Sequence, residues 1–507
     1  MNDLDRPWWS HPVYIATLVL LMAVPMLWPD LPPLSDLPAH MGRFRIEAGT
    51  VDAPTLAQSF SIHWLPIGNL GVDGLVMLLG PLLGIEAATK IVVLLIPALT
   101  AAGMLMVAAE AHGRIPPTAA FALPLAYGYP FQFGFVNYAL SMALALFAFA
   151  FALRLGGQGR WRTRAAILLA AGVLIYFAHV VGWAVLGLLC LAESVVRRSR
   201  EDGGAARRAG RAIVDCLPLA LPLLFILLWR GGEGGGGVSA LFDLRAKWGG
   251  IESALRDRHV WWDGNGALFL LAVPVVGAAT LFRPERRLAA AAAGLGVVYL
   301  CVPAEFFGLI YADMRLAPFL LALALLSLGP RAGASGRSLG IVAAAAALFL
   351  AARIAVATAG YAEDAAAQER HLKALDVLPK GARVAALIDL GCPRGWAPPR
   401  LTVASMAIVR RDAFVNDQFN MPGAQLVRLG PSVPREFGYQ DSTRVRLPGC
   451  DRPEPLLADR LAAVPRNWFD HVWLLGVPAA MRPREDWLHP VWQDDETALY
   501  RIVRPGG

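Results

Sequence analysis

Long apolar runs, repeated from residue 12 to residue 360, constrain the fold of this chain more than any other feature. Each is close to the roughly 18–25 residues that a helix needs to cross about 30 Å of hydrocarbon. Only 17% of the 507 residues are charged, whereas soluble chains have about 25%. We therefore predict an α-helical polytopic membrane protein with about 11 transmembrane helices. The runs lie at 12–28, 87–109, 118–133, 138–153, 165–178, 180–196, 212–229, 265–282, 288–306, 315–329 and 339–360.

One further apolar stretch, 69–84, is short and is interrupted by Gly71, Asp73 and Pro81. It is below the length that crosses a bilayer, so we predict a re-entrant or interfacial segment. Its length alone leaves open whether it spans the membrane.

The basic residues cluster in connections between the apolar runs, at 154–164, 197–211, 283–287 and 331–337. With about eleven spans and a cytoplasmic N-terminus, all of these connections fall on the cytoplasmic side, as the positive-inside rule requires. The net charge of +7 is thus explained by topology, and nucleic acid is not expected as a partner. We predict an integral protein of a bacterial-type inner (cytoplasmic) membrane.

The last part of the chain, 362–507, has a different pattern. Its apolar segments have the length of strands, at 383–388, 471–475 and 498–503, and helical patterns occur at 363–376 and 454–463. We expect a transmembrane domain 1–361, with an extracytoplasmic first loop 29–86, and a small extracytoplasmic (periplasmic) α/β domain 362–507. Cys392 and Cys450 lie in this domain and could pair outside the cytoplasm, although the sequence does not decide it.

Ionisable residues follow directly on the first apolar run. Asp36 and His40 are four residues apart, which places them on one face of a helix. A carboxylate with a nearby imidazole can act as a general base or share a metal ion, and Arg43 and Arg45 could neutralise a phosphate. The alternative is a helix N-cap at Ser35 or Asp36 followed by a solvated basic face.

Other polar residues are predicted on the same outer face. His179 separates two apolar runs, and Arg315 stands at the start of another, where the helix dipole disfavours a cation unless an anion is bound. Lys247 and Asp313 are further candidates for substrate binding. The alternatives are an aromatic-belt histidine at position 179 and an anchoring Arg315 that is paired with Asp313.

These residues carry a resemblance to a known family, whereas the usual soluble-enzyme motifs do not occur in the sequence. The chain resembles the GT-C-type integral membrane glycosyltransferases, which transfer sugars from polyprenyl-phosphate-linked donors. The resembling segments are 36–40 after the first span, 134–140, the turn at His179, the Asp313–Arg315 segment with Pro318, and the segments 469–473 and 499–501.

The resemblance implies inverting transfer at the extracytoplasmic face. Asp36 matches the general base of the family, and Arg315 would contact the donor phosphate, with Arg43, Arg45 or Lys247 as further cations. The acceptor would be a lipid, a glycan or a protein. The chain departs from the family in lacking a second acid in an Asp-x-Asp or Glu-x-Asp pair. A divalent metal ion, Mg or Mn, held by Asp36 and His40 is therefore an open expectation.

Two other functions remain consistent with the sequence. One is a non-catalytic transporter or assembly protein for lipid or polysaccharide, although a transporter is expected to carry charges in mid-span, where this chain has few. The other is a ligase of lipid-linked polymer, which would share the outward-facing site.

Overall fold

The computed structural model describes residues 6–229, 238–239, 242–306, 309–392, 396, 402–421 and 423–504. The chain divides into two compact units. Unit 1 consists of Met1–Trp28, Pro66–Val72 and Ile91–Gly360, and unit 2 consists of Pro29–Leu65, Asp73–Lys90 and Tyr361–Gly507. Residues 29–65, which were predicted as part of the first extracytoplasmic loop, are thus grouped with the C-terminal part.

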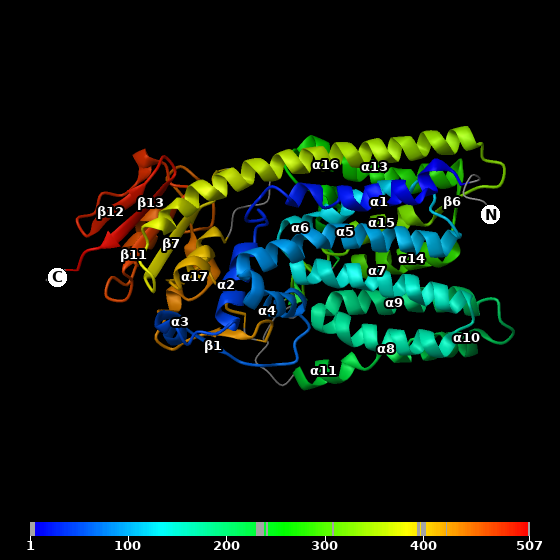
Figure 1. Cartoon of the computed structure of the whole chain (residues 1–507), viewed down its shortest axis with the longest axis horizontal. Helices are drawn as coiled ribbons and strands as arrows, with labels where there is room; N and C mark the ends of the chain where they lie inside the picture. The colour runs from blue at the N-terminus through cyan, green and yellow to red at the C-terminus, as the bar shows by residue number, and fades with distance from the viewer. Residues whose placement is uncertain are drawn as a thin grey trace. The chain divides into compact units, whose positions relative to one another are not determined.

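The chain is a helical polytopic membrane protein, as predicted (Figure 1). Among the described residues, six helices are long and apolar enough to cross a membrane, or seven if the bent pair α10 (Ala205–Val214) and α11 (Pro222–Trp229) forms one span. The six are α5 (Ile85–His112), α7 (Val136–Gly157), α8 (Trp161–Ala178), α9 (Val180–Arg198), α13 (Val260–Ala279) and α16 (Gly336–Leu372).

The predicted number of about eleven spans is larger because several apolar runs form short or broken helices. The run 118–133 forms two 3₁₀ segments and the four-residue α6 (Tyr129–Gln132), with Pro124 and Pro130 near their starts. Proline has no backbone N–H to donate and so interrupts an α-helix. The other short helices are α1 (Pro12–Leu21), α14 (Arg286–Cys301) and α15 (Ala317–Leu326). The uncertain stretch 69–84 contains the 13-residue α4 (Gly71–Leu83).

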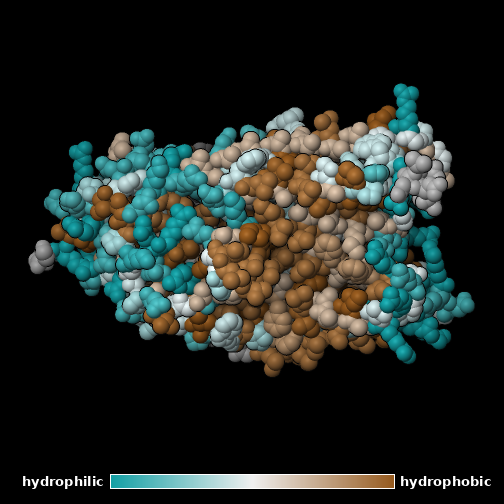
Figure 2. Space-filling view, in the orientation of Figure 1, coloured by the Kyte–Doolittle hydropathy of each residue, from teal (hydrophilic) through white to brown (hydrophobic). Residues whose placement is uncertain are grey.

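The arginine-rich connections of unit 1 gather at one end of its helices, as the charge pattern predicted (Figure 1). Strand β3 (Phe282–Pro284) pairs with β6 (Leu328–Pro330) and joins two of these connections. Arg287 donates a 3.0 Å hydrogen bond to the Ala111 carbonyl, and Arg154 bonds Glu110 at 2.6 Å. In Figure 2 this end is hydrophilic, and the helices beside it present an apolar surface.

Unit 2 contains a mixed sheet with the strand order β10-β7-β11-β13-β12, with β8 beside β7. Four strands form the parallel part of the sheet: β7 (Arg383–Asp389), β8 (Phe414–Val415), β10 (Arg444–Val445) and β11 (His471–Leu475). Two antiparallel strands extend it beside β11: β13 (Thr497–Ile502) and then β12 (Leu488–Gln493). Strands β7, β11 and β13 confirm the three predicted strands. Every residue of β11 is buried, which explains its continuous apolar sequence.

The same unit includes the helices α2 (Leu37–Glu47), α3 (Pro54–Ser59), α17 (Met406–Arg411) and α18 (Leu457–Ala462). Strand β1 (Phe60–Ile62) pairs antiparallel with β9 (Val427–Leu429) and connects the segment after α2 to the C-terminal part of the chain. Residues far apart in the sequence therefore build unit 2 together.

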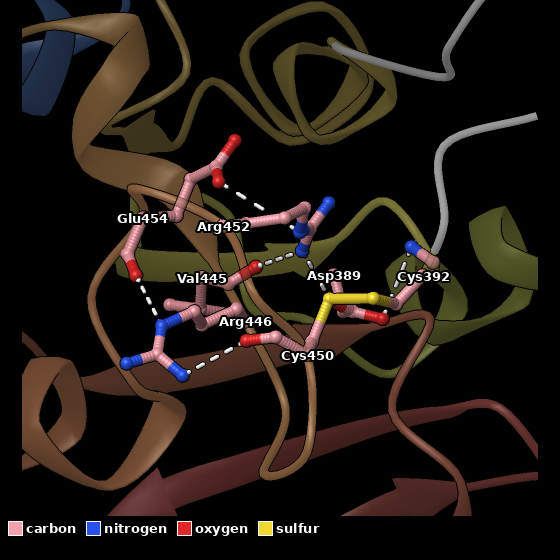
Figure 3. Close-up of a disulfide and its surroundings, with 8 residues drawn as sticks. Asp389, Cys392, Val445, Arg446, Cys450, Arg452 and Glu454 are labelled. Atoms are coloured by element: carbon pink, nitrogen blue, oxygen red, sulfur yellow. Dashed lines mark hydrogen bonds and ion pairs between the residues drawn. A yellow bond between two sulfur atoms is a disulfide. The ribbon is translucent and has the colours of Figure 1, made fainter.

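A disulfide between Cys392 and Cys450, which the sequence left open, forms in unit 2 (Figure 3). It joins the segments that follow β7 and β10, with a Cα–Cα distance of 5.8 Å. Next to it, Arg452 bonds Asp389 at 2.8 Å and donates to the Val445 carbonyl at 3.0 Å. The disulfide and this ion pair therefore hold the same two strand ends together.

Candidate functional site

Asp36 occupies the N-cap position of α2, and Pro38 in the first turn favours a helix start there because its fixed φ suits the helix. The Asp36 side chain makes no capping hydrogen bond to the helix, so the simple capping role is not its use. Asp36 is 6% exposed and His40 is 8% exposed. The alternative of a solvated basic face is therefore wrong, because nearly the whole of α2 is buried.

The segment 402–419 of unit 2 holds the start of α2 through side chains that bond its backbone. Thr402 Oγ1 donates to the Ser35 carbonyl at 2.8 Å and accepts from the Ala39 N–H at 3.3 Å. At the same residue, Gln418 Nε2 donates to the Ala39 carbonyl at 3.1 Å. A Cβ on Gly42 would lie 2.7 Å from Gln418 Nε2, so only glycine allows this close approach without a shift.

A second buried acid, Asp417, lies on this same segment. Its carboxylate accepts the Ser405 N–H at 2.9 Å, and Ser405 Oγ donates to its backbone carbonyl at 3.0 Å. Burial raises the pKa of Asp417 well above its ordinary value, and the charge of Asp36 raises it further. The hydrogen bonds with Ser405 and the charge of Arg444 act in the opposite direction. Asp36 and Asp417 therefore lie within electrostatic range of one another.

Arg43, one of the predicted phosphate ligands, has carboxylates as its partners. Its guanidinium is 1% exposed and lies 2.7 Å from Asp73 and 3.6 Å from Glu47. Desolvation raises the pKa of Glu47 to about 8, the charge of Asp73 raises it as well, and that of Arg43 lowers it. This triad ties α2 to α4. Arg45 bonds Asp412 at 2.6 Å, so it too already has an anionic partner.

In unit 1 the structure brings together two of the predicted residues. Arg315 Nη1 lies 3.2 Å from His179 Nε2, and the guanidinium carbon is 3.9 Å from the centre of the Phe135 ring. Tyr138 donates its hydroxyl to the Arg315 carbonyl. His179 Nδ1 lies 3.2 Å from the Val181 N–H and caps α9. Because donors face both ring nitrogens, His179 is not doubly protonated here.

The predicted pairing of Arg315 with Asp313 is replaced by another ion pair. Lys247 Nζ, on α12 (Leu244–Glu252), bonds the Asp313 carboxylate at 2.6 Å, and the two side chains are 3% and 9% exposed. Tyr299 donates its hydroxyl to the Lys247 carbonyl. This pair anchors α12 to the segment before α15, so Lys247 and Asp313 have a structural use in the unit.

In the ranges that the structure describes, no group of three or more His, Cys, Asp or Glu side chains could hold a metal ion. Asp36 and His40 therefore find no third protein ligand of these types among those ranges. Mg or Mn generally prefers several oxygen ligands, some of them from substrate phosphates. Metal dependence accordingly stays a prediction, and no chemical step is assigned to a metal.

Asp417 was not predicted as a site residue, because a second acid was sought next to Asp36 in the chain. The acid comes instead from Asn416-Asp417-Gln418, directly after the two-residue β8. Three polar residues after a buried strand, in an otherwise apolar stretch, were the available signal.

Comparison with solved structures gives similarity across nearly the whole chain. ArnT from Cupriavidus metallidurans matches in its apo state with 13% identity and a TM-score of 0.48, covering 97% of this chain and 98% of that one. The same protein bound to undecaprenyl phosphate matches with 12% identity and a TM-score of 0.47, at the same coverage. The arabinofuranosyltransferase AftD from Mycobacteria (class 1 of a mutant) matches with 18% identity and a TM-score of 0.47, over 97% of this chain and 41% of AftD.

No protein-family model and no curated protein matches the chain. Because the identities and TM-scores are low, the roles of individual residues are argued from the geometry of this chain.

Proposed function

We propose that this integral membrane protein is a glycosyltransferase that transfers a sugar from a polyprenyl-phosphate-linked donor to an acceptor hydroxyl, with inversion. The observation that carries the proposal is the position of Asp36. It is a buried acid at a helix start, its side chain is not used as a cap, and the helix start is fixed by three hydrogen bonds from Thr402 and Gln418 of another segment. Buried ionisable groups held in this way cluster at reaction centres.

In the proposed reaction, Asp36 accepts the proton of the acceptor hydroxyl while the acceptor oxygen attacks the anomeric carbon. The bond from that carbon to the phosphate oxygen breaks, and polyprenyl phosphate leaves with the bonding electrons. A single displacement needs one base and a stabilised leaving group, rather than the two carboxylates of a glycosidase.

We assign the contact with the donor phosphate to Arg315. Arg43 and Lys247 already bond carboxylates, so a substrate phosphate would have to compete with a buried ion pair. The assignment to Arg315 rests on its position over the Phe135 ring and against the His179 imidazole. A guanidinium there retains its positive charge and can bind phosphate oxygens in a bidentate manner.

The orientation belongs to the same proposal. The Cys392–Cys450 disulfide favours an oxidising compartment for unit 2, and the arginine-rich end of unit 1 favours the cytoplasmic side for those connections. We therefore place unit 2 at the periplasmic or extracellular face of a bacterial-type inner membrane, where the acceptor lipid, glycan or protein would bind.

The proposal is tested by measuring sugar transfer from polyprenyl-phosphate-linked sugars to envelope acceptors with the purified, detergent-solubilised chain. Asp36→Asn is expected to reduce transfer by about 10²–10⁴-fold, the usual contribution of a general base. Asp376→Asn is the matched control, since this acid of unit 2 is 81% exposed. Full activity of Asp36→Asn would contradict the proposal.

A further inference from the structure

The segment 402–419 is separated from Asp36 by most of the sequence, yet two of its polar side chains, Thr402 and Gln418, bond the start of α2. Thr402 bridges the Ser35 carbonyl and the Ala39 N–H, and Gln418 bonds the Ala39 carbonyl. The His40 ring lies 5.4 Å from the ring of Phe419. These contacts fix the backbone on both sides of Asp36, so the segment determines where the Asp36 carboxylate points.

Asp417 is the member of this segment that has no evident structural need to be an acid. Its side chain is fully buried, and one carboxylate oxygen accepts the Ser405 N–H. Its other oxygen, Oδ1, has no hydrogen-bond partner within the described part of the chain. Burial of an unsatisfied carboxylate oxygen is costly, which indicates a use beyond packing.

We propose that Asp417 is a positioning residue of the reaction centre and forms a carboxyl pair with Asp36. This inference rests on the proposed function, in which Asp36 is the general base and Asp417 is the acid beside it. Two carboxyl groups in one buried site do not both ionise readily, so one of them retains its proton.

Within the pair, the deeper Asp417 retains the proton and Asp36 carries the negative charge that a base needs. The ionisable groups around Asp417 agree with this order. On α2 the group is Asp36, which opposes the ionisation of Asp417. Arg444 favours that ionisation, but its guanidinium also bonds Asp441 at 3.0 Å. As the pH rises and Asp417 ionises, the added negative charge at the site should disturb the base and the approach of an anionic donor.

A pH-dependent double-mutant cycle on the purified full-length chain tests the pair without any substrate. The melting temperature is measured for wild type, Asp36→Asn, Asp417→Asn and the double variant, at about pH 5 and about pH 9. At the high pH either single substitution relieves the repulsion, so their effects should be clearly non-additive. At the low pH the pair is not doubly charged, and the effects should add.

Additive effects at both pH values would overturn the carboxyl pair. The matched control is the cycle of Asp36→Asn with Asp376→Asn, which should be additive at both. If Asp417→Asn does not fold, Asp417→Ser, which keeps an acceptor for the Ser405 N–H, takes its place in the cycle.

Activity provides the second readout. The pH profile of sugar transfer by Asp417→Asn should extend to higher pH than that of wild type, because an amide cannot ionise. An equal loss at every pH would reduce Asp417 to a structural role. If no sugar transfer is found at all, the proposed function fails while the stability cycle still decides the pair.

Discussion

The two units place buried charge in opposite ways. In unit 2, acids outnumber cations around α2, where Arg43 is shared by Asp73 and Glu47, and Asp36 lies near Asp417. In unit 1, the cation Arg315 lies among Phe135, Tyr138 and His179. The first environment raises the pKa of carboxyl groups and suits proton transfer. The second maintains a positive charge over aromatic faces and suits the binding of an anion.

The difference teaches that a buried charge has to be interpreted through its partner. Arg43, Lys247 and Arg315 are equivalent in the sequence as cations on a predicted outer face. Carboxylate partners give Arg43 and Lys247 a structural use, whereas Arg315 contacts aromatic rings and His179.

The largest expected effect follows from removing Arg43, which pairs with Asp73 and Glu47 in the acidic cluster of unit 2. Arg43→Ala leaves Asp73 and Glu47 buried without it, and we expect a loss of about 3–5 kcal/mol in unfolding free energy. Chemical denaturation of the detergent-solubilised protein measures it. Arg45→Ala is the control, because Arg45 is 19% and its partner Asp412 25% exposed, and should cost less than about 1 kcal/mol. Equal effects of the two substitutions would show that the cluster is not held by Arg43.

The disulfide is expected to have the next largest effect, also confined to unit 2. It closes a loop with a sequence separation of 58 residues, so its reduction should destabilise the unit by about 2–4 kcal/mol. Thermal unfolding with and without a reductant measures this for wild type. The Cys392→Ser variant should no longer respond to reductant; a remaining response would mean that another thiol pair is involved.

The acidic cluster predicts a pH dependence of stability. The pKa of Glu47 is raised from 4.5 to about 8 in the folded chain, so the folded state binds more protons than the unfolded state between these values. Its contribution is complete below about pH 4.5 and is lost as the pH rises towards about 8. Glu47→Gln should therefore flatten the fall of the melting temperature across this window by several degrees. If the melting temperature of Glu47→Gln falls as steeply as that of wild type, other groups cause the pH dependence.

The smallest expected effect concerns the site in unit 1. Arg315→Lys keeps the charge but loses the planar contact with Phe135, and the KM for the polyprenyl-phosphate-linked donor should rise about tenfold, or about 1.4 kcal/mol. Lys247→Arg, at the ion pair with Asp313, serves as the comparison and should leave the donor KM nearly unchanged. If the two substitutions raise it equally, the distinction between the two cations fails.

The sequence predicted those parts of the molecule that depend on local pattern. The length of the apolar runs predicted a polytopic helical membrane protein but gave more spans than the six or seven found among the described residues. The strands β7, β11 and β13 agree with the predicted segments within a residue. The run 118–133, which prolines interrupt, was wrongly predicted as a span. Hydropathy measures only apolar character, whereas a proline also lacks the N–H that a helix needs. The start of α2 at Asp36 was predicted from a local signal as well.

The partners of the site residues could not be predicted, since they come from distant parts of the chain. Pairing of Asp313 with its neighbour Arg315 was an alternative that the sequence allowed, but Lys247 bonds Asp313 from another helix. Asp417 lies far from Asp36 in the sequence, and only the packing of 402–419 against α2 relates the two. The fold decides which charged residues pair, and the spacing of residues along the chain does not reveal it.

The central claim is that Asp36 acts as the base, whereas Arg315 binds the donor. The most direct measurement is steady-state sugar transfer with the donor concentration varied, for wild type, Asp36→Asn and Arg315→Ala. We expect Asp36→Asn to lower kcat by about 10²–10⁴-fold with little change in donor KM, and Arg315→Ala chiefly to raise the donor KM. The reverse pattern, with kcat preserved in Asp36→Asn, would contradict the account.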